Sequence, residues 1–367
     1  MNGQEAVELL HRMVAIASPS GEEGDLADFL AGWMSEFGMR SRIDEAGNVI
    51  GEIGNGAGPT IAMIGHLDTV DDPIPTRLTE TRLYGRGAVD AKGPLAAMLA
   101  SAVKAGPSFP GTLIVAGAVE EETPGSRGAM HLRRSWSRPD ALIVGEPSGW
   151  DSVVLGYKGK IDIAYRVSRP ATHPSNPVEK AVEAATAFWA AALEAAGPER
   201  SHTAFRLPGV TLCELVGDMV EARLELSYRT PPGYDGDALV ARLRHLAGDG
   251  SVEVLNAVRA VSVGRRDPVV RSLTAGIRRV GGTPHPKLKT ATSDMNTLGE
   301  VWDIPMATYG PGDSSLDHSV SEHIVIDEFL RGIDVLGAAV DELRPVADDN
   351  LVDAALPVPT WKGSAHP

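Results

Sequence analysis

The chain has 367 residues, 43% hydrophobic and 23% charged, a composition typical of a globular protein with about two domains. Its net charge of −15 argues against a nucleic-acid partner, because phosphate contacts need clustered Lys and Arg. The single cysteine, Cys213, excludes an intramolecular disulfide framework. Because the chain shows neither a secretory-signal pattern nor an apolar run of roughly 18 residues, we expect a cytoplasmic protein with no membrane partner.

The first part of the chain alternates between strand and helix patterns. Short apolar runs bounded by Gly and Pro predict buried strands at 60–65, 111–119 and 140–144. Apolar residues at helical spacing predict helices at 4–17, 94–105 and 126–134. Ser20 is the predicted N-cap of a further helix, with Glu22 and Glu23 in its first turn. Such alternation favours a mainly parallel sheet covered on both faces.

The pattern changes near residue 158. Strands at 160–169, 222–229 and 251–263, with helices at 177–196 and 236–247, follow the order of a small α+β domain. The earlier rhythm then returns, with predicted strands at 286–290 and 305–309 and a helix at 327–343. We therefore predict an α/β protein with a mixed, mainly parallel sheet flanked by helices. Its predicted parts are 1–158 and 265–344, an inserted α+β domain at 159–264, and a C-terminal tail at 345–367.

Histidine and acidic residues follow the predicted strands, where ligands bind in open α/β sheets. They are His66 and Asp68, Asp90 before a helix, Glu120 to Glu122, Glu146, and His318. Each has an ordinary reading by itself, as a loop histidine, a helix N-cap or a solvated acidic turn. Together, two histidines and three carboxylates would suit two divalent ions that share a bridging carboxylate. Such ligands favour zinc, with cobalt or manganese as alternatives, and a further glutamate could serve as general base.

The motifs resemble those of the di-zinc acetylornithine deacetylase, succinyl-diaminopimelate desuccinylase and carboxypeptidase G family. The resemblance covers about residues 1–344 and rests on HLD at 66–68, GRGAVDAKG at 85–93, EEE at 120–122, GEP at 145–147 and His318. It implies a zinc-peptidase fold in which the inserted, ferredoxin-like domain forms a lid and mediates homodimerisation.

The resemblance also implies a role for each site residue. The metal ligands would be His66, Glu122, Glu146, His318 and a bridging Asp90. Glu121 would be the general base, and Asp68 would orient His66. His173 would stabilise the oxyanion, often across the dimer, and Arg229 would pair with a substrate carboxylate. The loop residues Thr292, Ser293 and Asp294 would also face the substrate. The ordinary readings of His173 and Arg229 are a loop histidine and a strand-end surface arginine.

Within the family, the chain is most similar to the branch that releases lysine or ornithine from the amino-group carrier protein LysW. GRGAVDAKGP, the triple glutamate and YGPGDSSLDH carry this similarity. It implies a metal-dependent amidohydrolase of lysine or arginine biosynthesis, which cleaves an amide at the C-terminal glutamate of an acidic carrier. The alternatives are a deacylase of small N-acyl amino acids, such as acetylornithine, acetyllysine or succinyl-diaminopimelate, a dipeptidase, carboxypeptidase or aminopeptidase, and a catalytically silent metal-binding homologue.

Overall fold

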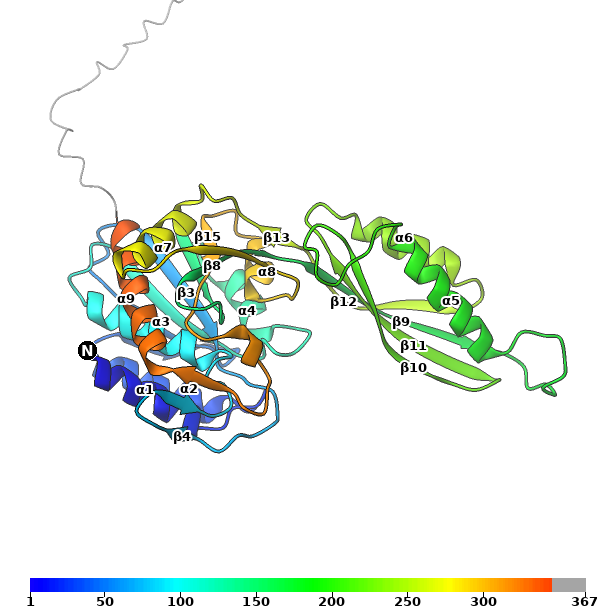
Figure 1. Ribbon diagram of the computed structural model, residues 1–367, viewed down its shortest axis with the longest axis horizontal. Coiled ribbons are helices and arrows are strands. Elements are labelled where there is room, and N and C mark those ends of the chain that lie inside the picture. The colour runs from blue at the N-terminus through cyan, green and yellow to red at the C-terminus, as the bar shows by residue number, and fades with distance from the viewer. Residues whose placement is uncertain (345–367) are drawn as a thin grey trace, which may run out of the picture.

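The computed structural model describes residues 1–344, which form a large and a small domain (Figure 1). The predicted tail at 345–367 lies outside the described residues. The strands of the large sheet are β1 (Arg40–Ile43), β2 (Val49–Ile53), β3 (Thr60–His66), β6 (Thr112–Ala118), β7 (Ala141–Gly145), β8 (Ser152–Tyr157), β13 (Val261–Ser262), β14 (His285–Lys289) and β15 (Met306–Thr308). The helices of the large domain are α1 (Gly3–Ala15), α2 (Gly24–Glu36), α3 (Lys92–Ala105), α4 (Arg127–Ser135), α7 (Pro268–Arg279), α8 (Asp294–Gly299) and α9 (Ile326–Glu342).

The large sheet is mixed and parallel at its centre. Its strand order is β1-β2-β6-β3-β7-β15-β8-β13, and β14 also pairs with β8. The neighbours β6, β3, β7 and β15 run parallel, while β1, β2 and β13 pair antiparallel. A smaller sheet of β4 (Arg77–Leu78), β5 (Arg82–Tyr84) and β16 (His323–Val325) lies beside it, and a 3-10 turn spans Ser314–Leu316. The predicted fold class is therefore confirmed.

Both faces of the large sheet are buried. Ile61 and Met63 point into one core, which α1, α2, α3, α7 and α9 complete. Ala62 and Ile64 point the other way, into a core shared with α4 and α8. Because successive side chains of a strand alternate between faces, a strand covered on both sides needs an unbroken apolar run. This requirement explains why β3 was recognisable in the sequence.

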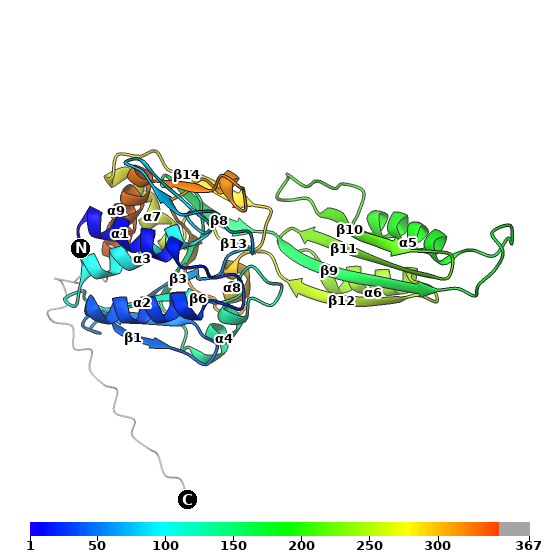
Figure 2. The same ribbon diagram turned by 90° about the horizontal axis from the view of Figure 1, so that it is seen from below.

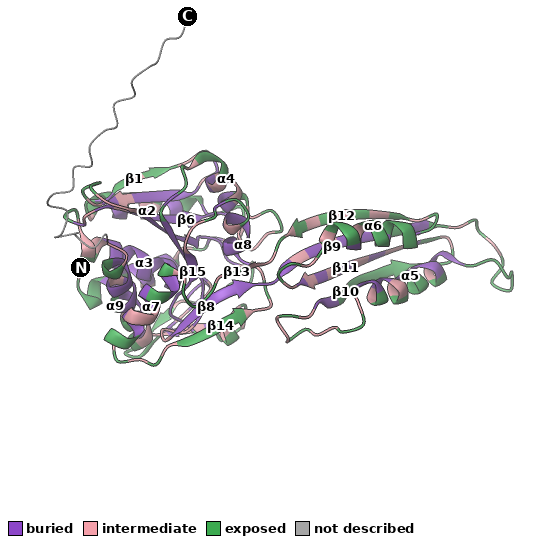
Figure 3. Cartoon of the chain, turned by 90° about the horizontal axis from the view of Figure 1, so that it is seen from above, coloured by how far each residue is buried: buried purple, intermediate pink, exposed green. Residues whose placement is uncertain are grey.

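The small domain is an antiparallel sheet with two helices. Its elements are β9 (Gly159–Ser168), α5 (Ala181–Ala195), β10 (Gly209–Gly217), β11 (Glu221–Thr230), α6 (Gly236–Leu246) and β12 (Ser251–Val258). The strand order β10-β11-β9-β12 is that of a ferredoxin-like fold. Figure 2 shows this domain beside the large one, joined to it through β8–β9 and β12–β13. It has a core of its own, in which Tyr165 stacks on Phe188, and Figure 3 shows buried residues where its helices meet the sheet.

Three sequence predictions need correction. Ser20 is not the N-cap of α2, because the cap residue is Glu23; the Ser20 hydroxyl instead donates to Asp68. The predicted strand at 251–263 is two strands, since β12 belongs to the small sheet and β13 pairs with β8. The helix predicted from 177 begins at Ala181. The other predicted elements are confirmed to within a few residues, and none of the helices in residues 1–344 is long and apolar enough to cross a membrane.

Candidate active site

Three neighbouring parallel strands bring His66, Glu122 and Glu146 together. In the sheet register, His66 at the end of β3 pairs with Ala118 of β6, and Gly65 pairs with Gly145 of β7. The turn of Glu120 to Glu122 follows β6, and Glu146 follows β7. Because the strands are parallel and in step, all of these residues emerge at one edge of the sheet.

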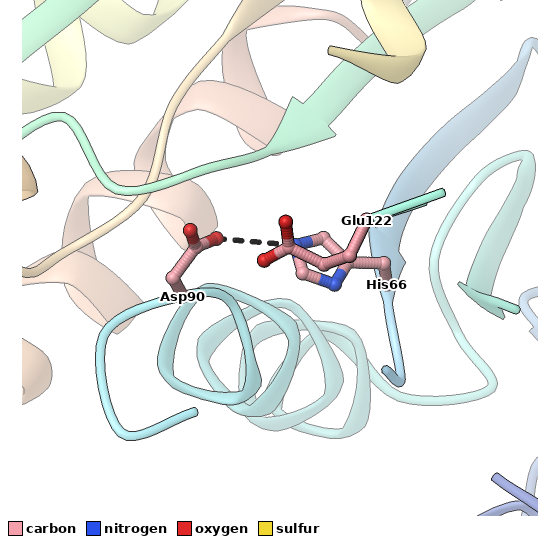
Figure 4. A group of neighbouring side chains, drawn as sticks. All are labelled: His66, Asp90 and Glu122. Atoms are coloured by element: carbon pink, nitrogen blue, oxygen red, sulfur yellow. Dashed lines mark hydrogen bonds and ion pairs between the residues drawn. The ribbon is translucent and has the colours of Figure 1, made fainter. Parts of the chain in front are cut away.

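Asp90 lies between the two predicted ligand histidines. Its Oδ1 is 3.1 Å from Nε2 of His66, and its Oδ2 is 3.2 Å from Nε2 of His318. The same His318 nitrogen is 2.8 Å from Oε1 of Glu122. Figure 4 shows Asp90 and Glu122 converging on the ring of His66. A carboxylate with one oxygen toward each imidazole has the geometry needed to bridge two cations.

The donor set fits a pair of divalent ions. Ligand atoms of His66, Asp90 and Glu122 lie within 4.8 Å of one another, as do those of His66, Glu121 and Glu146. Burial raises the pKa of Glu121 well above its ordinary value, and the charge of Glu146 raises it further. Burial likewise raises the pKa of Glu146. Carboxylates crowded in this way repel one another, and a bound cation converts that repulsion into affinity.

Asp68 organises the glutamate turn. Its carboxylate accepts hydrogen bonds from the backbone N–H groups of Glu121 and Glu122, both at 3.0 Å, and from the Ser20 hydroxyl at 2.8 Å. His66 Nδ1 lies 2.9 Å from the backbone oxygen of Asp68 and 3.5 Å from its Oδ1. Residue 68 therefore fixes the His66 ring mainly through its backbone carbonyl, while its side chain fixes Glu121 and Glu122.

Glu322 supports the candidate bridging residue Asp90, and no pattern in the sequence pointed to it. Its buried carboxylate accepts from the N–H groups of Val89 and Asp90, at 2.8 and 3.1 Å. Arg86 donates to the same carboxylate at 2.8 Å. Its only sequence signal was an acid four residues after His318, in a loop that already held several acids.

Asp90, Glu122, Glu146 and His318 line a cleft between the two domains, and His66 is buried outside its lining. This cleft, about 320 Å³ in volume, is bordered by Asp90, Glu121, Glu122, Glu146, His318, Lys160, Arg229, Lys289, Thr292 and Ser293, among others. Arg229 comes from β11 of the small domain and donates to the Thr292 hydroxyl at 3.3 Å. A larger hollow of about 630 Å³, between α7 and β14, contains none of the predicted site residues.

The predicted substrate loop reaches the site in part. Thr292 and Ser293 line the cleft, and Ser293 also caps α8. Asp294 is buried and does not line the cleft; burial raises its pKa to about 7. The Asp294 side chain therefore lies behind the cleft surface.

His173 lies outside this cleft. It is exposed, and its Nδ1 is 2.8 Å from the Ser175 hydroxyl. Its loop, residues 169–180 between β9 and α5, is at the end of the small domain remote from the large domain (Figure 1). Within one chain, His173 does not join the other predicted site residues.

Comparison with known proteins gives consistent matches. The model of the family described as Peptidase family M20/M25/M40 matches residues 62–342. The chain is 38% identical to the [LysW]-lysine hydrolase of Deinococcus radiodurans over 93% of this chain and 98% of that protein. It is 28% identical to the [LysW]-lysine/[LysW]-ornithine hydrolase of Saccharolobus islandicus, over 93% of this chain and 96% of that protein.

Solved structures share the fold at low sequence identity. Aminopeptidase PepT of Bacillus cereus matches with a TM-score of 0.77 at 17% identity, over 93% of this chain and 99% of that chain. The M20 metallo-carboxypeptidase Sso-CP2 of Sulfolobus solfataricus matches with a TM-score of 0.75, also at 17% identity and over the same shares. At such identity the likeness concerns the fold alone.

Proposed function

We propose that this chain, which belongs to peptidase family M20/M25/M40, is a metal-dependent amidohydrolase that releases lysine or ornithine from an amino-group carrier protein. Two relatives named for [LysW]-lysine or [LysW]-ornithine hydrolysis support the substrate, since each aligns over 93% of this chain. The main structural support for this reaction is the position of Asp90. Its two carboxylate oxygens face His66 and His318, next to the glutamate turn.

The proposed cofactor is a pair of divalent ions, zinc in the first place and cobalt or manganese otherwise. Asp90 would bridge the pair. His66 and Glu146 would complete one site, and His318 and Glu122 the other. Such a pair, when bound, lowers the pKa of water and polarises a carbonyl.

Glu121 is the proposed general base. It lines the cleft, and its raised pKa suits a group that takes a proton from water and later gives it up. Here the second transfer would go to the departing amine of the amino acid. Asp68 would hold the base in place through the backbone N–H of Glu121.

Arg229 is the proposed anchor for the carboxylate of the released amino acid. A guanidinium can bind a carboxylate with two parallel hydrogen bonds, and Arg229 lines the cleft with a neutral hydroxyl as its hydrogen-bond partner. Thr292 would help to orient it. A substrate that lacks a free carboxylate on the amine side would lose this contact.

A homodimer is proposed from the position of His173. This histidine would act on the oxyanion only if a second chain brought the 169–180 loop to the cleft. An H173A variant mixed with an inactive E121Q variant tests this arrangement. Recovered activity in the mixture supports complementation between chains, whereas a monomer in sedimentation would contradict the dimer.

The experiment that tests the function is lysine and ornithine release by the zinc-loaded protein. Three substrates are assayed in parallel: a lysine-charged carrier protein, N-acetyllysine and N-acetylornithine. Release mainly from the carrier is expected. Release mainly from an acetylated amino acid would refute the carrier assignment and favour a small-molecule deacylase.

A further inference from the structure

Three lysine and arginine side chains line the cleft, and they differ in their partners. Lys160 Nζ lies 2.9 Å from Oδ2 of Asp162, so a carboxylate neutralises it. Arg229 donates to the Thr292 hydroxyl, and Lys289 Nζ donates to the Pro147 carbonyl at 2.7 Å. Within residues 1–344, neither Arg229 nor Lys289 forms an ion pair. The cleft therefore presents two cations that make no direct ion pair with a carboxylate of this part of the chain, although Glu146 and Asp317 lie within electrostatic range of Lys289.

The two cations come from different domains. Arg229 is carried by β11 of the small domain. Lys289 ends β14 of the large domain, and its ammonium lies against Pro147, the residue after the candidate ligand Glu146. Two separate anionic groups on a substrate could thus be bound beside the candidate metal site.

The proposed substrate has two such groups, and the inference rests on the proposed function. When an amino acid is joined by an amide to a carrier's C-terminal glutamate, its own carboxylate stays free on the amine side. The glutamate also keeps one carboxylate, because only one of its two carboxyl groups forms the amide. We infer that Lys289 binds this acyl-side carboxylate and thereby selects a glutamyl over an acetyl group.

Two probes that differ in one carboxylate test the inference. The first is N-acetyl-γ-glutamyl-lysine and the second 4-acetamidobutyryl-lysine, both joined to the α-amino group of lysine. The wild type should favour the first by about 10- to 100-fold in kcat/KM, in line with one charge-assisted hydrogen bond. K289M should lower that ratio at least about tenfold, and K289R should retain most of it. Each probe is also tested as an inhibitor of carrier hydrolysis. Its inhibition constant measures binding and replaces kcat/KM for a probe that is not cleaved.

K287M is the matched control. Lys287 lies on the same strand, and its Nζ donates to the Ser148 carbonyl at 2.6 Å, yet it does not line the cleft. This variant should keep the wild-type ratio. An equal loss on both probes in K289M, or the same loss of ratio in K287M, would overturn the inference in favour of a structural role for Lys289. Release of lysine from neither probe nor the carrier would refute the proposed function itself.

Discussion

Replacement of Asp68 by Asn tests whether this buried carboxylate holds the glutamate turn in place. The carboxylate accepts two backbone N–H groups and one hydroxyl at 2.8–3.0 Å. Asparagine has one acceptor oxygen, so its amide N–H₂ would face the N–H of Glu121 or Glu122. One unpaired buried donor costs about 1–3 kcal/mol. The remaining hydrogen bonds are also weaker in D68N, because their acceptor no longer carries a charge. We therefore expect D68N to lose about 2–4 kcal/mol of stability.

The same change should lower kcat. A displacement of Glu121 by about 1 Å is enough to cost roughly 100-fold in rate. Steady-state kinetics and chemical denaturation, both with saturating metal, measure the two effects. S20A is the control, because it removes one donor to the carboxylate and leaves both backbone bonds; we expect it to cost about 1.5 kcal/mol, with little effect on kcat. A D68N enzyme with wild-type kcat and stability, or an S20A enzyme as impaired as D68N, would refute the reasoning.

The stability difference should also depend on pH. Burial raises the pKa of Asp68, but its bonds to His66, Ser20 and Glu122 outweigh burial and lower it overall. A carboxyl whose pKa is depressed on folding stabilises the protein above the unfolded pKa. The advantage of wild type over D68N should therefore persist at pH 7, begin to decline as the pH falls through about 3.9, and be lost only below the depressed folded-state pKa.

Three further predictions concern the metal site. E121Q should bind the same amount of metal yet lose about 10²- to 10⁴-fold in kcat; normal turnover in a metal-loaded sample would exclude the base role. E322Q should lower stability by about 3–5 kcal/mol and reduce metal occupancy, because it breaks a buried ion pair behind Asp90; unchanged occupancy by metal analysis would contradict the positioning role. The hydrogen bond to Asp90 raises the pKa of His318 to about 9, so protons compete with metal below that pH. Calorimetry should show metal affinity falling about 100-fold from pH 8 to pH 6 for one displaced proton, and a constant affinity would contradict this.

The strands that carry the site were predictable because both faces of the sheet are buried. The run at 61–65 is apolar without interruption, and Gly58 and Pro59 lie just before the strand on its N-terminal side. The candidate ligands were also visible, because several histidine and acidic residues together in loops next to buried strands are harder to explain structurally than any one of them alone. The small domain was recognisable from the alternating pattern of β9 and β11, which each cover a core on one face.

Residues that act through their hydrogen bonds were not predictable. Ser20 looked like a helix cap, but its hydroxyl bonds to a carboxylate 48 positions away. Glu322 bonds to backbone groups more than 230 positions away. Neither partner leaves a local pattern in the chain, because the contact forms only when distant segments meet. The break between β12 and β13 had the same origin, since pairing with β8 draws the chain back to the large sheet.

The sequence by itself determined the buried central strands, most of the helices and the chemical identity of the candidate donor set, because apolar periodicity and side-chain type are local properties. It did not reveal the strands β1, β2, β8 and β10. The tertiary structure decided which of these residues meet. It placed Asp90 between two histidines and turned the Asp68 carboxylate toward the glutamate turn. It also left the 169–180 loop, which carries His173, at the far end of the small domain. These outcomes depend on strand register and domain placement, which arise from contacts between residues far apart along the chain.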